Sequence, residues 1–117
     1  MLYLTSLESL LASVKGAHAA LLLDSEGEVV VEAGDKQWRH RLIGAYEGIA
    51  LYELRRIVTR HEMGHLEYVT RRHAGGSVIL RPLKDGYYLI VSLGPDAAVA
   101  EAVHRSEVTR VALNEGL

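Results

Sequence analysis

The chain has 117 residues and a formal net charge of −2, with 49% apolar and 24% charged residues. This length and balance predict a single compact domain over residues 1–117 with one modest core. The slight negative charge is atypical of general nucleic-acid binders, so we expect no nucleic-acid partner. The absence of cysteine excludes disulfides, thiolate zinc sites and cysteine nucleophiles.

The first residues do not have the pattern of an export signal. MLYLTSLESLL lacks a basic lead-in and carries Glu8 among its leucines. The longest apolar run, AALLL, is far too short to span a bilayer. We therefore expect a cytoplasmic protein without membrane insertion.

Residues 5–15 have the pattern of an amphipathic helix. Thr5 and Glu8 match a capping box at its start, and Gly16 offers the left-handed conformation that ends many helices. The apolar stripe of this helix consists of Leu7, Leu10, Leu11 and Val14.

A β-hairpin is predicted next. Residues 17–24 have the composition of a buried strand and residues 28–33 that of the returning strand. Gly27 supplies the positive φ angle that the turn needs. Asp24 begins the turn, and we expect its carboxylate to cap the turn rather than to act in catalysis.

Residues 35–63 predict one long helix. Asp35 is the expected N-cap, no proline interrupts the segment, and Gly64 follows its end. Five residues fall within about one quadrant of the helical wheel and are predicted to face the core: Ile43, Tyr46, Ala50, Leu54 and Ile57.

Three strands and a final helix complete the chain. The segment 65–73 is rich in β-formers but highly charged, which is typical of an edge strand. A strand over 77–83 follows, and the strand over 87–93 is the most apolar, so we expect it at the centre. Asp96 is the expected cap of a helix over residues 97–114. Its inward residues are predicted to be Ala100, Val103 and Val111.

The predicted order, α-β-β-α-β-β-β-α, implies an α/β (α+β) domain. Its five-stranded antiparallel sheet would carry a long helix on one face and two helices on the other. This order resembles the Roadblock/dynein light-chain domain, including the bacterial MglB-like regulators of small GTPases. The stretch ALLLDSEGEVVVEAG (20–34) is similar to the first hairpin of that family, and DGYYLIVSL (85–93) is similar to a later one.

The resemblance implies a function as well as a fold. Members of the family form homodimers or heterodimers in which the second helices lie antiparallel and the two sheets join at their edges. One face of the dimer docks a Ras-like GTPase or a larger assembly. The resemblance thus implies a non-enzymatic homodimeric regulator or scaffold of a small Ras-like GTPase, with no catalytic residue and no cofactor.

One side of the long helix is predicted to form the partner interface. Gly44 and Gly48 each cost roughly 1 kcal/mol relative to alanine in a helix, so their spacing suggests the close approach of another backbone. Leu51, Tyr52 and Arg55 share that side, and tyrosine and arginine are enriched in interface hot spots. Packing within the monomer is the alternative explanation for the glycines.

The charged third strand is a second candidate interface. Tyr68, Arg71 and Arg72 lie along it. Charges on an edge strand usually block unwanted pairing, but they can also flank a wanted pairing with a second copy. The sequence leaves both possibilities open, and the resemblance favours pairing.

The stretch HEMGH (61–65) matches the H-E-x-x-H pattern of zinc proteases. That pattern needs both imidazoles on one helical turn, and Gly64 predicts that the helix ends before His65. His61 is expected to extend the core stripe as a half-buried residue, or to favour the negative end of the helix. A metal site and metal hydrolysis are therefore a third, disfavoured hypothesis.

The second hypothesis is a small-molecule-sensing domain of PAS or profilin-like type. It requires an internal cavity, which the small strand residues Ala17, Ala19 and Ala20 would leave. No phosphate-binding loop or nucleophile elbow is present, so the chain is not itself expected to be a GTPase or a serine hydrolase.

Overall fold

The computed structural model describes residues 2–117, except for the side chain of Trp38. Its helices and strands are α1 (Leu2–Ser13), β1 (Ala17–Leu23), β2 (Val29–Gly34), α2 (Trp38–Arg60), β3 (Val69–His73), β4 (Gly76–Pro82), β5 (Tyr88–Leu93) and α3 (Val99–Gly116). A short 3₁₀ turn, η1 (Lys84–Gly86), joins β4 to β5. The element order and the predicted fold class are confirmed.

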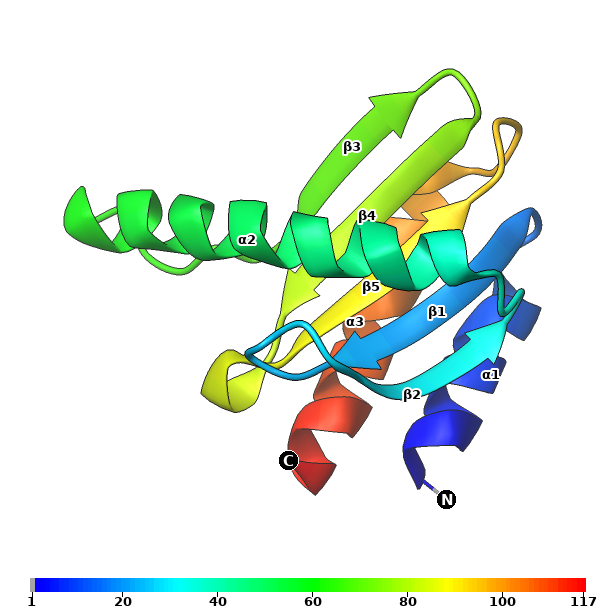
Figure 1. The fold of residues 1–117 in the computed structure, drawn as a ribbon, viewed down its shortest axis with the longest axis horizontal. Coiled ribbons are helices and arrows are strands. Elements are labelled where there is room, and N and C mark those ends of the chain that lie inside the picture. The colour runs from blue at the N-terminus through cyan, green and yellow to red at the C-terminus, as the bar shows by residue number, and fades with distance from the viewer. Residues whose placement is uncertain (1) are drawn as a thin grey trace.

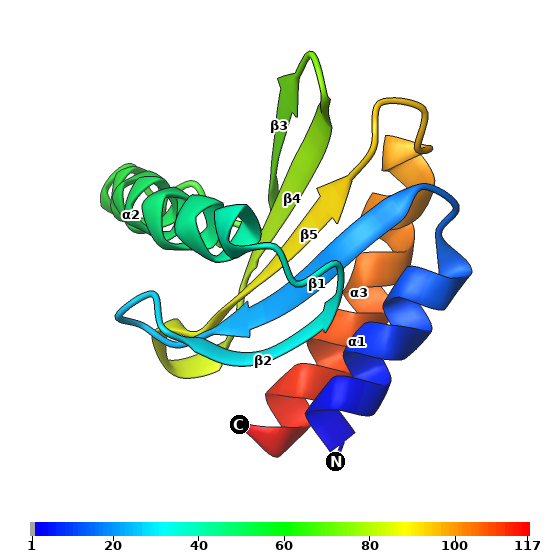
Figure 2. The ribbon, with the colours of Figure 1, turned by 45° about the vertical axis from the view of Figure 1, so that its right-hand side comes forward.

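The five strands form one antiparallel sheet in the order β2-β1-β5-β4-β3. As predicted, the apolar strand β5 is central and the charged strand β3 lies at an edge. Helix α2 crosses one face of the sheet, while α1 and α3 lie side by side on the other (Figures 1 and 2). None of the helices in the described residues is long and apolar enough to cross a membrane.

The two faces of the sheet carry separate apolar clusters because side chains alternate along each strand. On β1, Ala20 and Leu22 point toward α1 and α3, whereas Ala19, Leu21 and Leu23 point toward α2. Both alanines are fully buried among large apolar side chains. This packing disfavours the internal cavity that the small-molecule hypothesis requires.

The first hairpin turns as expected. Gly27 has a φ angle of 84°, and the Asp24 carboxylate accepts hydrogen bonds from the backbone N–H groups of Glu26 and Glu28, at 2.9 and 3.0 Å. Asp24 therefore caps its own turn, as predicted.

Three of the predicted helix starts are wrong. Helix α1 already begins at Leu2, so Thr5 and Glu8 lie within the helix and not at its start. Helix α2 begins at Trp38 with Gln37 as its N-cap; Asp35 lies earlier and accepts a hydrogen bond from the Gln37 N–H at 3.1 Å. Helix α3 has Ala98 rather than Asp96 at its N-cap.

The inward face of α3 is also different from the prediction. Ala100 and Val111 are exposed, and Val103 is only partly buried. The buried residues of this helix are Ala102, Ser106, Thr109 and Leu113. Ser106 and Thr109 are polar, so the periodicity of apolar residues alone did not identify this face of the helix.

Candidate functional site

Helix α2 lies on the sheet through its smallest residues. A Cβ atom on Gly44 would lie 3.1 Å from the Leu23 side chain, and one on Gly48 would lie 2.1 Å from the Tyr88 hydroxyl oxygen. That hydroxyl donates a hydrogen bond to the Gly44 carbonyl oxygen at 3.1 Å. The two glycines therefore admit the chain's own sheet, which is the alternative explanation given above, and not a second helix.

The apolar stripe predicted to face the core points away from it. Tyr46 is 66% exposed and Ile57 51% exposed, whereas Leu51 is only 3% exposed. The prediction is wrong because it took the side of α2 with the most large apolar residues as the side that faces the sheet. The side that contacts the sheet instead carries the two glycines, which allow the helix to approach closely. Ile43, Tyr46, Ala50, Leu54 and Ile57 are hereafter called the apolar flank.

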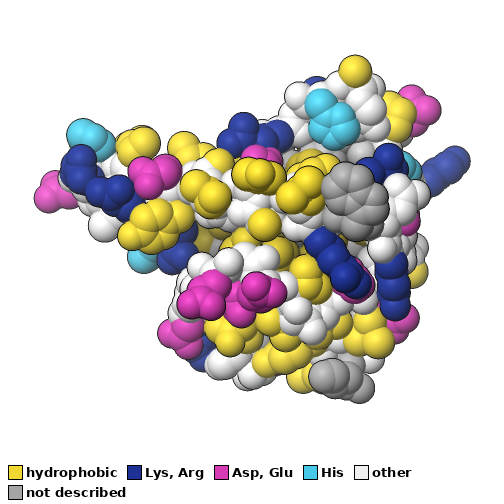
Figure 3. Space-filling view, viewed as in Figure 1, with side chains coloured by type: hydrophobic (Ala, Val, Ile, Leu, Met, Phe, Trp, Pro, Cys, Tyr) yellow, Lys and Arg dark blue, Asp and Glu magenta, His cyan; other side chains and the backbone are white. Residues whose placement is uncertain are grey.

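The apolar flank lies on the side of α2 that faces β3. Glu47 shares this side, and its carboxylate pairs with the guanidinium Nε of Arg71 on β3 at 2.7 Å. Burial raises the pKa of Glu47 above its ordinary value, and Arg71 opposes that shift. Directly outward, opposite the sheet, lie Leu42 and Ile49, one heptad apart and both exposed. Figure 3 shows hydrophobic side chains along the middle of this helix, with charged side chains gathered toward its C-terminal end.

Strand β3 presents its charged residues to both faces of the sheet. It pairs with β4 on one side, and its other side has no strand partner within the described residues. Arg71 lies on the α2 face, whereas Arg72 reaches the Pro95 carbonyl oxygen at 3.4 Å on the other face. Tyr68 precedes the strand and is partly exposed.

A buried arginine joins β4, α3 and the segment before β3. Arg81 is 4% exposed, and its guanidinium donates to Ser106 Oγ at 2.7 Å and to the Val103 carbonyl oxygen at 2.8 Å. It also pairs with Glu107 at 3.0 Å and lies 5.0 Å from the centre of the Tyr68 ring. Desolvation lowers the pKa of Arg81, while Glu107 opposes the shift. These contacts hold Tyr68 at the exposed edge.

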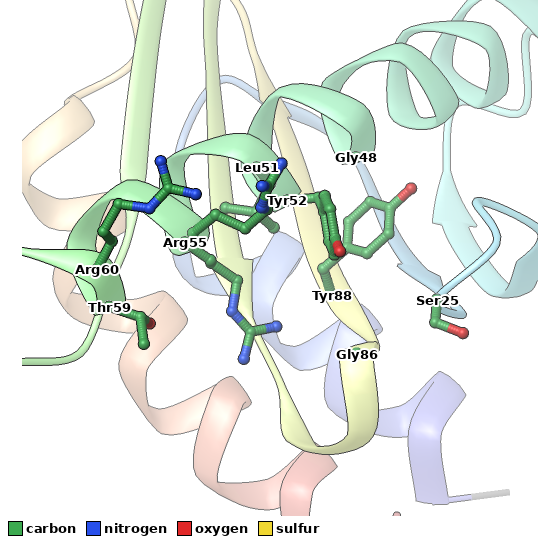
Figure 4. A pocket seen from close by; sticks show the side chains of 10 residues that line it. Ser25, Gly48, Leu51, Tyr52, Arg55, Thr59, Arg60, Gly86 and Tyr88 are labelled. Carbon is green, nitrogen blue, oxygen red and sulfur yellow. The ribbon is translucent and has the colours of Figure 1, made fainter.

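The opposite flank of α2 borders a groove of about 700 Å³. It is lined by Ser25, Gly48, Leu51, Tyr52, Arg55, Arg56, Thr59, Arg60, Gly86 and Tyr88. Figure 4 shows the α2 residues above the groove and Tyr88 as its floor, with Ser25 and Gly86 in the turns on the far side. Gly48, Leu51, Tyr52 and Arg55, four of the five predicted interface residues on this helix, thus line a groove instead of a flat contact face.

The HEMGH stretch does not form a helical zinc motif. Helix α2 ends at Arg60, with His61 as its C-cap. Glu62 and Gly64 have φ angles of 55° and 85°, so the chain leaves the helical path before His65. The predicted helix end ahead of His65 is therefore confirmed. His61 is exposed at the C-cap, so of its two predicted placements the half-buried one is wrong and the one at the negative end of the helix is confirmed. Within residues 2–117, no three His, Asp or Glu side chains are grouped so that they could hold a metal ion.

The fold and the long exposed helix define the class of this protein. A five-stranded antiparallel sheet with one long helix on one face and two helices on the other is a Roadblock-type α+β domain. No protein-family model matches the sequence, and no curated protein does.

Solved structures match along almost the whole chain. The Roadblock/LC7 domain from Streptomyces avermitilis gives a TM-score of 0.82 at 19% identity, covering 95% of this chain and 93% of that one. MglC from Myxococcus xanthus gives 0.72 at 20% identity, with 100% of both chains covered. Myxococcus xanthus MglB gives 0.84 at 11% identity, covering 97% of this chain and 92% of that one. The chain has the Roadblock/LC7 fold, and the resemblance inferred from the sequence is confirmed at that level.

Sequence reasoning missed the groove and the buried arginine. The signal for the groove was present in Arg55, Arg56 and Arg60, which alternate with Tyr52 and Thr59 along one flank. Arg81 lies in an otherwise apolar strand, SVILRPL, and a lone charge in such a strand indicates a buried partner.

Proposed function

We propose that this chain is a non-enzymatic, homodimeric regulator or scaffold of a small Ras-like GTPase. The observation that carries the proposal is the row of large apolar side chains exposed on α2. Tyr46, Ile49 and Ile57 are each more than half exposed. Contiguous apolar surface of this kind on a soluble domain marks an interaction site.

Two sides of α2 serve two different partners in this proposal. The apolar flank, together with Tyr68 and Arg71 at the β3 edge, contacts the same surface of a second copy. The unpaired edge of β3 supports this assignment, because the backbone groups of an open edge can pair with another strand. Pairing two copies about a twofold axis would place their outward α2 ridges next to each other.

The outward ridge, formed by Leu42 and Ile49, contacts the GTPase. The fold shared with MglB and MglC supports a role in a GTPase pathway. A regulator that binds one nucleotide state more tightly shifts the GTPase toward that state by its differential affinity. The proposal names no arginine as a catalytic finger.

The test uses two single substitutions and a small Ras-like GTPase encoded near this gene. Affinity is measured by calorimetry with the GTPase loaded with GDP and with a non-hydrolysable GTP analogue. Ile49→Glu is expected to weaken binding at least about tenfold, a loss of about 1.4 kcal/mol, while leaving the mass of the chain in solution unchanged. Val108→Glu, at an exposed site on α3, is the matched control and is expected to bind like the wild type.

Equal affinity of Ile49→Glu and the wild type would refute the assignment of the ridge. If the wild-type chain binds the GTPase in neither nucleotide state, that GTPase is not the proposed partner. Neither result bears on self-association, which is measured separately by mass.

A further inference from the structure

The groove on the far flank of α2 is not explained by the dimer or by the outward ridge. Its α2 wall is turned toward the β1–β2 turn and η1, whereas the apolar flank is turned toward β3. A partner in this groove would therefore leave both proposed interfaces free.

The floor of the groove is fixed by packing. Tyr88 is buried, passes under α2 at Gly48, and is tethered by its hydrogen bond to the Gly44 carbonyl oxygen. Burial raises the pKa of the Tyr88 hydroxyl, and the nearby Asp24 adds to that shift. Leu51 lies beside Tyr88 and is also buried. Together they give the groove an apolar base that does not need to rearrange when a partner binds.

The wall of the groove is cationic. Arg55, Arg56 and Arg60 line it, and no acidic side chain does so among the described residues. Of these three arginines, Arg56 alone has an ion pair within the part of the chain that the structure describes, with Glu53 at 3.4 Å. Its guanidinium also lies 6.0 Å from the centre of the Tyr52 ring. The opposite rim of the groove is lined by Ser25 and Gly86. The neighbouring Asp24 carboxylate accepts a hydrogen bond from the Glu26 N–H of its own turn.

We propose that this groove docks an acidic segment of a partner protein. An aliphatic or aromatic side chain of the segment rests on Tyr88 and Leu51, and carboxylates on either side of it pair with Arg55 and Arg60. The charges of the groove favour this partner. The three arginines can pair with carboxylates, and the apolar base can hold an apolar side chain between them. A planar guanidinium also binds a carboxylate through two hydrogen bonds at once. A cationic segment would be repelled by the same wall.

The probe is a fluorescein-labelled synthetic peptide in which a leucine and a tryptophan are flanked by glutamates. Its anisotropy is measured against the full chain. We expect saturable binding that weakens as salt is raised, because part of the interaction is between exposed charges. A peptide with lysine at every glutamate position is expected not to bind.

The decisive variant reverses the two outer charges, Arg55→Glu with Arg60→Glu. Both side chains are exposed, so the fold is expected to persist, and its thermal transition is the check. Binding of the acidic peptide is expected to weaken at least about tenfold. Arg105→Glu, at an exposed site on α3, is the control and is expected to leave the affinity unchanged.

A second readout locates the peptide. Gly48 and Gly86 line the groove. Their backbone amide NMR signals are therefore expected to shift when the acidic peptide is added to the isotope-labelled chain. Unchanged affinity in the double variant, shifts confined to the β3 edge, or binding of anionic vesicles in place of the peptide would each overturn the proposal.

Discussion

Gly48 lies where the ring of Tyr88 passes beneath α2, and this close contact requires that no side chain extend from position 48 toward the sheet. Glycine normally weakens a helix interior by about 1 kcal/mol relative to alanine, because its backbone is freer in the unfolded chain. Here the missing side chain makes room for the buried ring of Tyr88, whose hydroxyl donates a hydrogen bond to the Gly44 carbonyl oxygen of the same helix. The local weakness of the helix is thus offset by a tertiary contact.

Gly48→Ala is expected to destabilise the protein despite the better helix propensity of alanine. The new methyl would lie 2.1 Å from the Tyr88 oxygen, so the ring or the helix must move. Overpacking of this kind costs about 1–3 kcal/mol, which exceeds the gain in propensity. Urea denaturation measures the change in the free energy of unfolding.

The Tyr88→Val background provides the control for this substitution. Without the ring, Gly48→Ala is expected to be neutral or stabilising. If Gly48→Ala stabilises the chain that retains Tyr88, the ring and α2 are not in the close contact that the structure shows.

At the scale of elements, the number and order of the strands were predictable, whereas the faces of the helices were not. One strand start was also wrong, because β3 begins at Val69 and not at residue 65. The sheet followed from runs such as YYLIVSL, whose composition and bounding turns are local features. The side of α2 that meets the sheet depends instead on the contacts of Gly44 with Leu23 and of Gly48 with Tyr88. These partners are 21 and 40 residues apart in the sequence, so no local window covers them. The same applies to α3, where Ser106 is buried because Arg81 binds it.

Arg81 ties three elements together, and Arg81→Met is expected to loosen them. The substitution keeps much of the side-chain volume but removes the hydrogen bonds to Ser106 and Val103 and the pair with Glu107. The expected loss is roughly 2–3 kcal/mol, since bonds to a buried charge are lost and buried acceptors remain. Arg105→Met, on the exposed side of α3, is expected to change stability by less than about 0.5 kcal/mol. Equal effects of the two substitutions in denaturation would contradict the role of Arg81.

The pH dependence of stability tests the pairing of Glu107. The hydrogen bond from Arg110, with further help from the charges of Arg110 and Arg81, holds the pKa of Glu107 below its ordinary value of 4.5. A carboxyl with a lowered folded pKa stabilises the fold above its unfolded pKa, and this contribution is lost as the pH falls through the folded pKa. Glu107→Gln is therefore expected to unfold more easily than the wild type near neutral pH.

In urea titrations across the acidic range, the difference between Glu107→Gln and the wild type is expected to shrink as the pH falls below 4.5 and to disappear below the folded pKa of Glu107. A difference that stays constant with pH would mean that the ion pairs of Glu107 do not stabilise the fold.

At the scale of the whole molecule, the domain shows three distinct surfaces on one helix. Helix α2 crosses the sheet and its C-terminal half projects beyond it (Figure 1). Its apolar flank faces β3, its ridge points outward, and its cationic wall borders the groove. Gly44, Gly48 and Leu51, predicted from the sequence as interface residues, contact the sheet or the groove floor. For this reason we propose the apolar flank as the surface that binds a second copy. The predicted roles of Tyr68 and Arg71 at the β3 edge stay predictions.

Static light scattering on the intact chain shows most directly whether the apolar flank of α2 binds a second copy. We expect a wild-type mass of about twice 12.9 kDa, and a mass of 12.9 kDa for Ile57→Glu with its thermal transition retained. Ile57 is about half exposed in the single chain, so the charge is tolerated there and excluded only from the interface. A wild-type chain that stays at 12.9 kDa, or an Ile57→Glu variant that keeps the doubled mass, would contradict this expectation.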